Sequence, residues 1–481
     1  MSNVTDALLR SGLSAVQSEL HAGTLTVRQI VEHYLQVNRD YQHLNAFLEI
    51  FEQDALHRAD ELDARLRSGK PMGKLFGMVV GLKDVIAIKG KRLTASSKIL
   101  DGFESLYHAT VTDRLLHADA VILGRCNCDE FAMGSSNENS AFGPVLNHLD
   151  NTRVSGGSSG GSAVAVQAGL CMTTLGSETG GSIRQPASFT GTIGLKPTYG
   201  RLSRYGLIAF ASSFDQIGPI TNNVEDMALM MEVMAGSDEK DSTSSQEAVP
   251  AYAAGLPLNR KLRIAYYPQT LDNPKIDPEI SAAVYTLIDK LRADGHTVEA
   301  NDLKYLDYLV PTYYVLTTAE ASSNLSRFSG IHYGFRDMEA EDMESVVRRS
   351  RSKGFGKEVQ RRIMLGTFVL SSGYYDAYYT RAQKVRRIIR DDTAATLADY
   401  DLILLPTTPT TAFRLGEKTT DPIEMYLADI FTVQANITGL PAISVPLFRH
   451  SNGMPFGVQF MGDLNREDLL LSVTDHVLKF Y

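Results

Sequence analysis

Apolar positions near the start of the chain recur at helical spacing. Residues 27–35 show this spacing, and Thr26 with Gln29 forms a capping-box pattern immediately before them. A second amphipathic stretch predicts a helix over residues 51–67. We therefore expect an N-terminal helical part over about residues 1–70.

Short apolar runs rich in β-branched residues predict strands further along the chain. The first run, residues 76–88, is typical of a strand buried on both faces, and only Lys83 and Asp84 bring charge into it. Later strands are predicted at 262–267, 401–406, 442–447 and 456–461, and helices at 278–293 and 466–480. Strands that alternate with helices predict an α/β sheet.

No linker divides the chain clearly. Residues 237–250 are rich in serine and acidic residues and should form an exposed excursion, but they are too few and too mixed in charge for a low-complexity linker. Although 481 residues could supply about three average domains, we predict one large α/β domain over residues 1–481.

Composition and charge exclude several classes of function. Hydrophobic residues make up 43% of the chain and charged residues 21%, as in folded globular proteins. The net charge of −9 argues against autonomous nucleic-acid binding, because the chain as a whole repels polyanions. No apolar run reaches the roughly 18 residues that a membrane helix needs, so we expect no membrane span and no secretion signal.

The cysteines and histidines predict neither disulfides nor a metal site. Cys126, Cys128 and Cys171 are too few and too scattered for a disulfide scaffold, and they fit a reducing, cytoplasmic compartment. The chain lacks a second cysteine pair at zinc-ligand spacing and has no H-E-x-x-H motif, so we expect no metal ligands.

Glycine and serine are concentrated in one segment. Residues 155–182 hold eight glycines and six serines in 28 positions. Such clusters expose backbone N–H groups and hydroxyls to a ligand, whereas a flexible linker is the alternative. The segment also contains the apolar block AVAVQAGL, which predicts a short buried helix between two glycine-rich turns. We therefore interpret the segment as an ordered site.

Common glycine motifs leave few alternatives for this site. A P-loop and a dinucleotide-binding pattern are both absent. The sequence GGSSGG does match the G-x-S-x-G nucleophile elbow, so a Ser-His-Asp mechanism stays open, although no downstream histidine has a distinctive setting. A lysine can also activate a serine when burial keeps its amine neutral, and Lys83 lies in an apolar strand. For most lysines, however, the amine simply reaches water.

Four motifs resemble those of the amidase signature hydrolases: GLKDV at 81–85, GGSSGGSA at 156–163, GSETGGSIRQPA at 176–187 and DQIGP at 215–219. The resemblance implies a central mixed β-sheet covered by helices on both faces and a catalytic core at about residues 71–235. It also implies a catalytic triad of Ser182 as nucleophile, Ser158 as bridging serine on a cis peptide, and Lys83 as base. The oxyanion hole would be formed by the backbone N–H groups of Thr179, Gly180, Gly181 and Ser182. Glu178 stands where many relatives have Asp, and we expect a supporting role for it.

Longer blocks, at 129–144, 320–334 and 354–379, resemble one branch of this family, the glutamine-hydrolysing subunits of tRNA-dependent amidotransferases. That likeness implies that Arg362 and Asp429 bind the α-carboxylate and α-ammonium of glutamine. Both positions also have simpler interpretations. Arg362 ends a basic run of seven cations over residues 348–362, which could be a solvated face or touch an RNA backbone, and Asp429 could be a surface acid.

The same likeness implies that the chain works with partner subunits and that the cofactors are bound by those partners. In that branch a B subunit binds the misacylated tRNA and uses ATP and Mg²⁺, a small C subunit supports the pair, and ammonia passes between active sites. We accordingly expect no cofactor in this chain, and Glu-tRNA(Gln) or Asp-tRNA(Asn) as the acceptor on the B subunit. A stand-alone amidase acting on small amides is the alternative enzyme, and a scaffold or RNA-binding module with a decayed site is the alternative outside catalysis.

Overall fold

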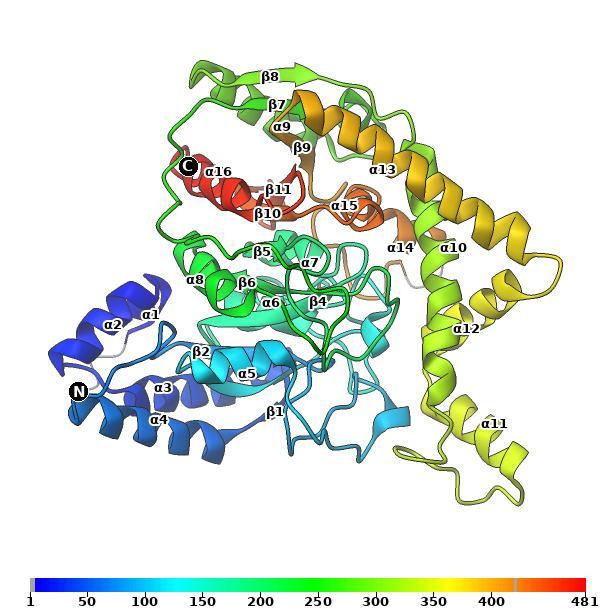
Figure 1. Ribbon diagram of the computed structural model, residues 1–481, viewed down its shortest axis with the longest axis horizontal. Helices are drawn as coiled ribbons and strands as arrows, with labels where there is room; N and C mark the ends of the chain where they lie inside the picture. Colours follow the sequence, from blue (N-terminus) through cyan, green and yellow to red (C-terminus); the bar gives the residue numbers. More distant parts are fainter. Residues whose placement is uncertain (1–4, 419–421) are drawn as a thin grey trace.

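One mixed β-sheet of eleven strands runs through the protein (Figure 1). The computed structural model describes residues 5–418 and 422–481. The strands, in spatial order across the sheet, are β1 (Phe47–Ile50), β3 (Val121–Cys126), β2 (Val79–Lys83), β4 (Thr173–Glu178), β6 (Gln216–Thr221), β5 (Ile193–Lys196), β10 (Ala442–Arg449), β11 (Pro455–Gly462), β9 (Leu402–Pro406), β7 (Arg263–Tyr266) and β8 (Thr297–Ala300).

The helices surround this sheet. They are α1 (Asp6–Arg10), α2 (Leu13–Ala22), α3 (Val27–Asp40), α4 (Glu52–Arg67), α5 (Thr110–His117), α6 (Gly160–Gln167), α7 (Arg184–Thr190), α8 (Val224–Met234), α9 (Pro278–Ala293), α10 (Leu306–Asn324), α11 (Met343–Gly354), α12 (Lys357–Leu370), α13 (Arg381–Asp399), α14 (Pro422–Leu427), α15 (Val433–Thr438) and α16 (Glu467–Leu478). None of the helices in the described ranges combines the length and apolar character that crossing a bilayer requires.

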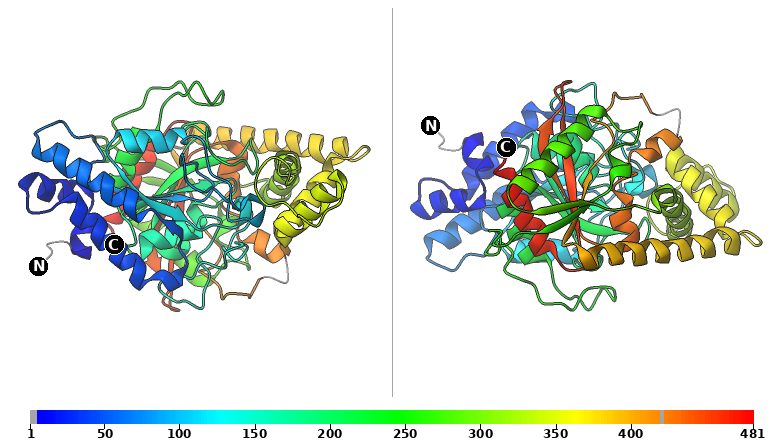
Figure 2. Two further views of the ribbon diagram at one scale, coloured as in Figure 1. Left: turned by 90° about the horizontal axis from the view of Figure 1, so that it is seen from below. Right: turned by 90° about the horizontal axis from the view of Figure 1, so that it is seen from above.

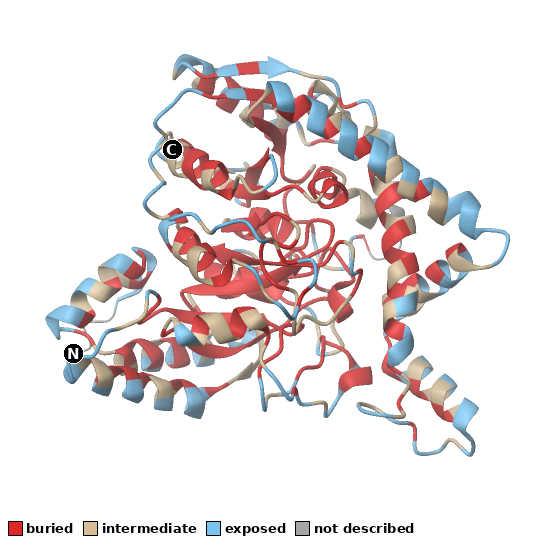
Figure 3. Ribbon diagram, in the orientation of Figure 1, coloured by how far each residue is buried: buried red, intermediate tan, exposed pale blue. Residues whose placement is uncertain are grey.

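Strand pairing and burial confirm the predicted α/β class. β2 is parallel to both β3 and β4, and β7 is parallel to β8 and β9, while the remaining neighbours pair antiparallel. Every residue of β2, β4 and β6 is buried, so helices cover both faces of the sheet there (Figure 3). α6 and α7 contact each other and the sheet, and α8 contacts α5 and α16 as a second group.

The strands and helices predicted after residue 260 are confirmed, and so are the Thr26–Gln29 capping box and the buried helix within the glycine-rich segment. Two expectations need correction. β1 lies inside the part expected to be helical and pairs antiparallel with β3. The strand predicted over 76–88 is limited to Val79–Lys83, because the chain turns there and the backbone N–H groups of Val85 and Ile86 donate to the carbonyl oxygen of Lys83. The division at residues 70 and 235 stays a prediction.

Helices α10 to α13 stand together at one end of the molecule, and the N-terminal helices lie at the other (Figures 1 and 2). α12 packs directly on α10, and a methyl group at Gly366 would overlap the carbonyl oxygen of Thr318. This close approach requires glycine at residue 366. This close packing holds α12, and with it Arg362, against α10.

Candidate active site

The predicted catalytic residues lie at the end of one parallel strand, in the loop after its neighbour, and in the loop before α6. Lys83 is the last residue of β2, and residues 179–182 follow the end of β4 and lead into α7. Because the carboxyl ends of parallel strands meet at one edge of a sheet, these groups are brought together. The loop of Ser158 leads into α6, and the backbone N–H of Ser159 donates to the carbonyl oxygen of Ser182 at 3.1 Å. That bond joins the two serine loops.

The Lys83 amine is buried and touches three oxygens. Its Nζ lies 2.6 Å from Ser158 Oγ, 2.9 Å from Ser159 Oγ and 3.2 Å from the carbonyl oxygen of Ser177. A carbonyl oxygen can only accept, and the Ser159 hydroxyl donates its own proton to that same carbonyl at 3.1 Å. A neutral amine would therefore use its two N–H bonds on Ser159 and Ser177 and direct its lone pair at Ser158.

Burial favours the neutral form of the Lys83 amine. It lowers the pKa of Lys83 to about 8, even though the surrounding acidic groups favour the charged form. Lys83 is thus able to act as a general base near neutral pH. The peptide bond between Gly157 and Ser158 is cis, as the resemblance implies.

Ser182 lies just before α7 and is 7% exposed. Lys83 is hydrogen-bonded to Ser158, and within the described residues no hydrogen bond joins the Ser158 and Ser182 hydroxyls. Hydrogen bonds at catalytic serines often tighten only when substrate is bound.

The loop before Ser182 is shaped by glycine. Gly181 has φ +147°, and a methyl group there would overlap the hydroxyl of Thr432, while one on Gly180 would overlap the ring of Tyr313. Thr432 Oγ1 also donates to the carbonyl oxygen of Gly180 at 2.7 Å. In the described part of the chain, the backbone N–H groups of Gly180, Gly181 and Ser182 donate to no protein acceptor. Unpaired N–H groups beside a nucleophile are what an oxyanion hole requires.

Glu178 is hydrogen-bonded to the two residues that follow this loop, Ile183 and Arg184. Its carboxylate accepts from the backbone N–H of Ile183 at 2.9 Å and from Arg184 Nε at 2.9 Å, and both charged side chains are fully buried. Burial alone would raise the pKa of the Glu178 carboxyl, but Arg184 holds it below its usual value. Arg184 also donates to the carbonyl oxygen of Thr432 and to Asn436. The expected supporting role of Glu178 therefore has a physical basis.

Glu178→Gln should destabilise the protein by about 3 to 5 kcal/mol, because it leaves the Arg184 guanidinium buried without a counter-charge. Urea unfolding followed by fluorescence should show the lower midpoint. Glu178→Asp is the matched control, since it keeps the charge and should lose much less stability. Equal midpoints for Glu178→Gln and the wild-type protein would contradict this account.

Arg362 is buried, which rules out the solvated-face interpretation for this residue. Its side chain is 3% exposed, and its guanidinium carbon lies 5.3 Å from the ring centroid of Tyr314 and 5.7 Å from that of Tyr426. Nε donates to Glu358 Oε1 at 2.8 Å. The two terminal nitrogens have no acceptor among the described residues. A buried guanidinium with both terminal nitrogens free can bind a carboxylate in bidentate fashion.

Asp429 is also buried, so it is not a surface acid. Its Oδ2 accepts from the Ser135 hydroxyl at 2.5 Å, while Oδ1 is buried without a partner in the described contacts. A methyl group on Gly181 would lie 3.3 Å from Oδ1, which places this oxygen against the nucleophile loop. Burial raises the pKa of Asp429 to about 7, and the charges of Arg362 and Arg184 oppose that rise. A bound ammonium group would satisfy this oxygen.

Two residues of the site could not be singled out from the sequence. Tyr313, on α10, bonds the hydroxyl of Thr179 at 2.8 Å and packs on Gly180. Ser135 orients Asp429 and lies inside the 129–144 block, so the resemblance of that block offered a signal for it. Tyr313 had no such signal beyond its position in an apolar helix.

Most of the other cations of the basic run form ion pairs or hydrogen bonds within the protein. Arg349 and Lys353 pair with Asp337 at 2.8 Å each, and Arg351 donates to the carbonyl oxygens of Leu325 and Phe328. These contacts weaken the interpretation of the run as an RNA-binding face.

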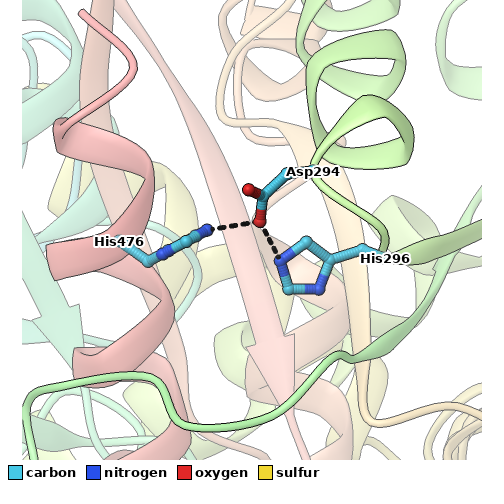
Figure 4. A group of neighbouring side chains, drawn as sticks. All are labelled: Asp294, His296 and His476. Carbon is cyan, nitrogen blue, oxygen red and sulfur yellow. Dashed lines mark hydrogen bonds and ion pairs between the residues drawn. The ribbon is translucent and has the colours of Figure 1, made fainter.

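One group of side chains has the composition of a metal site. Asp294, His296 and His476 gather between the α9–β8 turn and α16, and both imidazole Nε2 atoms face the same carboxylate oxygen, at 3.2 Å and 2.9 Å (Figure 4). His296 Nδ1, however, accepts from the backbone N–H of Leu262 at 2.9 Å. In the neutral ring Nε2 must then carry the proton, and metal-bound histidines normally have the opposite arrangement. The donor set therefore fits a hydrogen-bonded carboxylate better than a cation.

These contacts also bear on the Ser-His-Asp alternative. His476 is hydrogen-bonded to Asp294, His296 lies 3.2 Å from the same carboxylate, and His450 lies 3.1 Å from Asp277. Within the described part of the chain no histidine bonds Ser158 or Ser182. Lys83 is the basic side chain that contacts Ser158, so the structure favours a lysine as base.

Known proteins are similar to this chain in sequence and in fold. A model of the amidase family matches residues 29–471. The chain is 50% identical over 469 residues to the A subunit of glutamyl-tRNA(Gln) amidotransferase from Chlorobium luteolum, and the match covers 97% of this chain and 96% of the relative.

Two solved structures show the same architecture. The crystal structure of the A subunit of glutamyl-tRNA(Gln) amidotransferase from Thermotoga maritima superposes with a TM-score of 0.77 at 38% identity, over 98% of this chain and 94% of that one. The peptide amidase of Stenotrophomonas maltophilia superposes with a TM-score of 0.80 at 29% identity, over 97% and 96%. The fold is thus common to proteins of different names, and the chain belongs to the amidase family, as its glycine- and serine-rich motifs predict.

Proposed function

We propose that this chain is the glutamine-hydrolysing component of a glutamyl-tRNA(Gln) amidotransferase. The observation that carries the proposal is a pair of buried charged groups with hydrogen-bonding capacity to spare: Asp429, whose Oδ1 lies against Gly181, and Arg362, whose charge acts on Asp429. Arg362 offers two free terminal nitrogens and Asp429 one unpartnered oxygen, both buried. A free amino acid presents one carboxylate and one ammonium, which match these groups. The relatives at about 50% identity, which are named as the A subunits of such enzymes, support the same function.

The reaction follows from the order of the side chains. Lys83 takes the proton of Ser158, Ser158 takes the proton of Ser182, and Ser182 Oγ attacks the carboxamide carbon of glutamine. The unpaired N–H groups of the glycine loop stabilise the oxyanion. When the C–N bond breaks, the proton returns through the serines to the leaving nitrogen and ammonia departs. Water then hydrolyses the glutamyl ester, which releases glutamate and restores Ser182.

Partners would complete the reaction. We place the misacylated tRNA, ATP and Mg²⁺ on a B subunit, with a small C subunit supporting the pair, and assign only ammonia supply to this chain. The net charge of −9 supports that division, because the chain offers little attraction for tRNA. Asp-tRNA(Asn) is a second candidate acceptor on the same partner.

The dependence of hydrolysis on pH should differ between two kinds of substrate. With a neutral amide, kcat/KM should fall about tenfold per pH unit below about 8, because protonated Lys83 has no lone pair. With glutamine the fall should steepen toward about a hundredfold per unit below about 7, where Asp429 also becomes protonated and loses its attraction for the ammonium. Steady-state kinetics across these two pKa values would check both slopes. Identical profiles for the two substrates would contradict the assigned role of Asp429.

The stand-alone amidase is the second candidate, because the solved peptide amidase has the same fold. A serine-directed fluorophosphonate distinguishes the two by mass spectrometry of Ser182. We expect glutamine to protect Ser182 from labelling at concentrations where a simple aryl amide does not. Protection by the aryl amide alone would favour the stand-alone enzyme, and no adduct on Ser182 would favour the scaffold.

A further inference from the structure

Arg362 lies among three aromatic rings. Its guanidinium carbon is 5.6 Å from the ring centroid of Phe210, 5.3 Å from that of Tyr314 and 5.7 Å from that of Tyr426. Tyr314 belongs to α10 and Tyr426 to α14, and their rings stack with centroids 3.9 Å apart. A ring face attracts a cation but offers no directional acceptor. The rings alone therefore do not decide which N–H groups of Arg362 stay free for a ligand.

Glu358 supplies the directional contact to Arg362. It lies four residues earlier on α12, and its Oε1 accepts from Arg362 Nε at 2.8 Å. The side chain of Glu358 is only 11% exposed, so water competes little for this contact. Because a guanidinium is a rigid plane, a bond at Nε leaves the edge formed by the two terminal nitrogens for another acceptor. Those are the nitrogens that have no acceptor among the described residues.

The same oxygen of Glu358 is connected to the segment that carries Asp429. The Tyr426 hydroxyl donates to Oε1 at 3.2 Å, and the backbone N–H of Asp429 donates to the carbonyl oxygen of Tyr426 at 3.3 Å. One carboxylate oxygen thus contacts the arginine proposed to bind the α-carboxylate and the helix that leads to the aspartate proposed to bind the α-ammonium.

The position of Glu358 is itself fixed. It lies in the first turn of α12, and the backbone N–H of Gly356, just before the helix, donates to the buried carboxylate of Glu130 at 2.8 Å. Its second oxygen, Oε2, pairs with Arg361 at the surface. Both oxygens of the Glu358 carboxylate therefore have partners, and the start of α12 is anchored to the core.

We propose that Glu358 is a positioning residue that directs the free edge of Arg362 toward the α-carboxylate of glutamine. The proposal deepens the proposed function and rests on it, since it requires glutamine as substrate. The simpler interpretation is an ordinary ion pair between residues four apart on a helix, and exposed pairs of that kind contribute little. This pair, however, lies largely out of solvent and shares its carboxylate oxygen with Tyr426.

Glu358→Gln tests the proposal when glutamine is compared with 4-aminobutanamide, which keeps the amine and the carboxamide but lacks the α-carboxylate. We expect KM for glutamine to rise about 10- to 100-fold with kcat within about threefold, because a weaker hold on Arg362 loosens binding of the substrate carboxylate. The value of kcat/KM for 4-aminobutanamide should stay within about threefold of wild type, since that substrate makes no contact that Arg362 must be positioned for.

Glu344→Gln is the matched control. Glu344 pairs with Arg348 at the same four-residue spacing on α11, but its side chain is 88% exposed, and the variant should hydrolyse both substrates normally. Tyr426→Phe is a second variant, which removes only the hydroxyl bonded to Glu358 and should raise KM for glutamine about three- to tenfold. The rate at which a fluorophosphonate labels Ser182 shows whether each variant is folded.

The outcomes separate the role of Glu358 from the proposed function. An unchanged KM for glutamine in Glu358→Gln, or in Tyr426→Phe where the first variant does not fold, would overturn the positioning role and leave the function intact. An equal loss on glutamine and on 4-aminobutanamide would do the same, because it indicates a general structural role. A wild-type kcat/KM no higher for glutamine than for 4-aminobutanamide would overturn the proposed function, and the positioning role with it.

Discussion

Replacing Lys83 by methionine is expected to lower kcat/KM for glutamine by at least about 10⁴-fold, the size of effect seen when a member of a catalytic triad is removed. Methionine has nearly the volume of lysine, so packing in the buried site should be kept. The lost group is the amine that lies 2.6 Å from Ser158 Oγ. Steady-state kinetics and the rate of fluorophosphonate labelling of Ser182 should both report the loss.

Lys196 provides the matched control. It is also fully buried, and its Nζ donates to the carbonyl oxygen of Pro197 at 2.9 Å and to Gln216 at 3.1 Å; among the contacts of the described residues none joins it to Ser158 or Ser182. Lys196→Met should cost stability but keep catalysis within about tenfold of wild type, as expected for a residue that does not touch the reacting groups. Comparable loss of activity in the two variants would deny Lys83 its special role.

Asp429→Asn and Arg362→Lys should each lower kcat/KM for glutamine by about 10² to 10³-fold, since each weakens a buried charge-assisted contact with the substrate. Both variants should hydrolyse a simple aryl amide at close to the wild-type rate, because that substrate has neither an α-carboxylate nor an α-ammonium. Parallel kinetics with the two substrates measure this difference directly.

Arg361→Lys is the control for the arginine change. Arg361 is the neighbour of Arg362 on α12, but it is exposed and pairs with Glu358 at the surface. The control variant should hydrolyse both substrates normally. An equal loss on glutamine and on the aryl amide in Asp429→Asn or Arg362→Lys would remove these residues from glutamine binding and favour a general structural role.

The glycine- and serine-rich loops could be predicted as an ordered site because their pattern is local, while the triad assigned to them depended on the resemblance of their motifs to the amidase family. Glycine clusters beside serine, and a lysine inside an apolar run, are visible without knowing the fold. The strand ending at Lys83 could not be delimited this way. Its end is a turn in which the backbone N–H of Ile86 bonds the carbonyl oxygen of Lys83, and the sequence is apolar on both sides of that turn.

The side chains proposed to bind glutamine, Arg362 and Asp429, are placed by contacts between segments that are far apart in the chain. Local sequence patterns could therefore not identify them. Arg361 and Arg362 are neighbours in one basic run, yet they point to different sides of α12, and only the packing of that helix on α10 decides which is buried. Tyr313 reaches Thr179 across 134 positions. β1 was missed because it is four residues long and is stabilised by pairing with β3 instead of by a pattern of its own.

The most direct test of the central claim is conversion of Glu-tRNA(Gln) to Gln-tRNA(Gln) by the chain co-purified with its partners and supplied with glutamine, ATP and Mg²⁺. We expect conversion with the wild-type chain, no glutamine-dependent conversion with Ser182→Ala, and rescue of that variant by added ammonium, because only ammonia supply is lost. Copurification without any conversion, or hydrolysis of simple amides by a chain that binds no partner, would contradict the account.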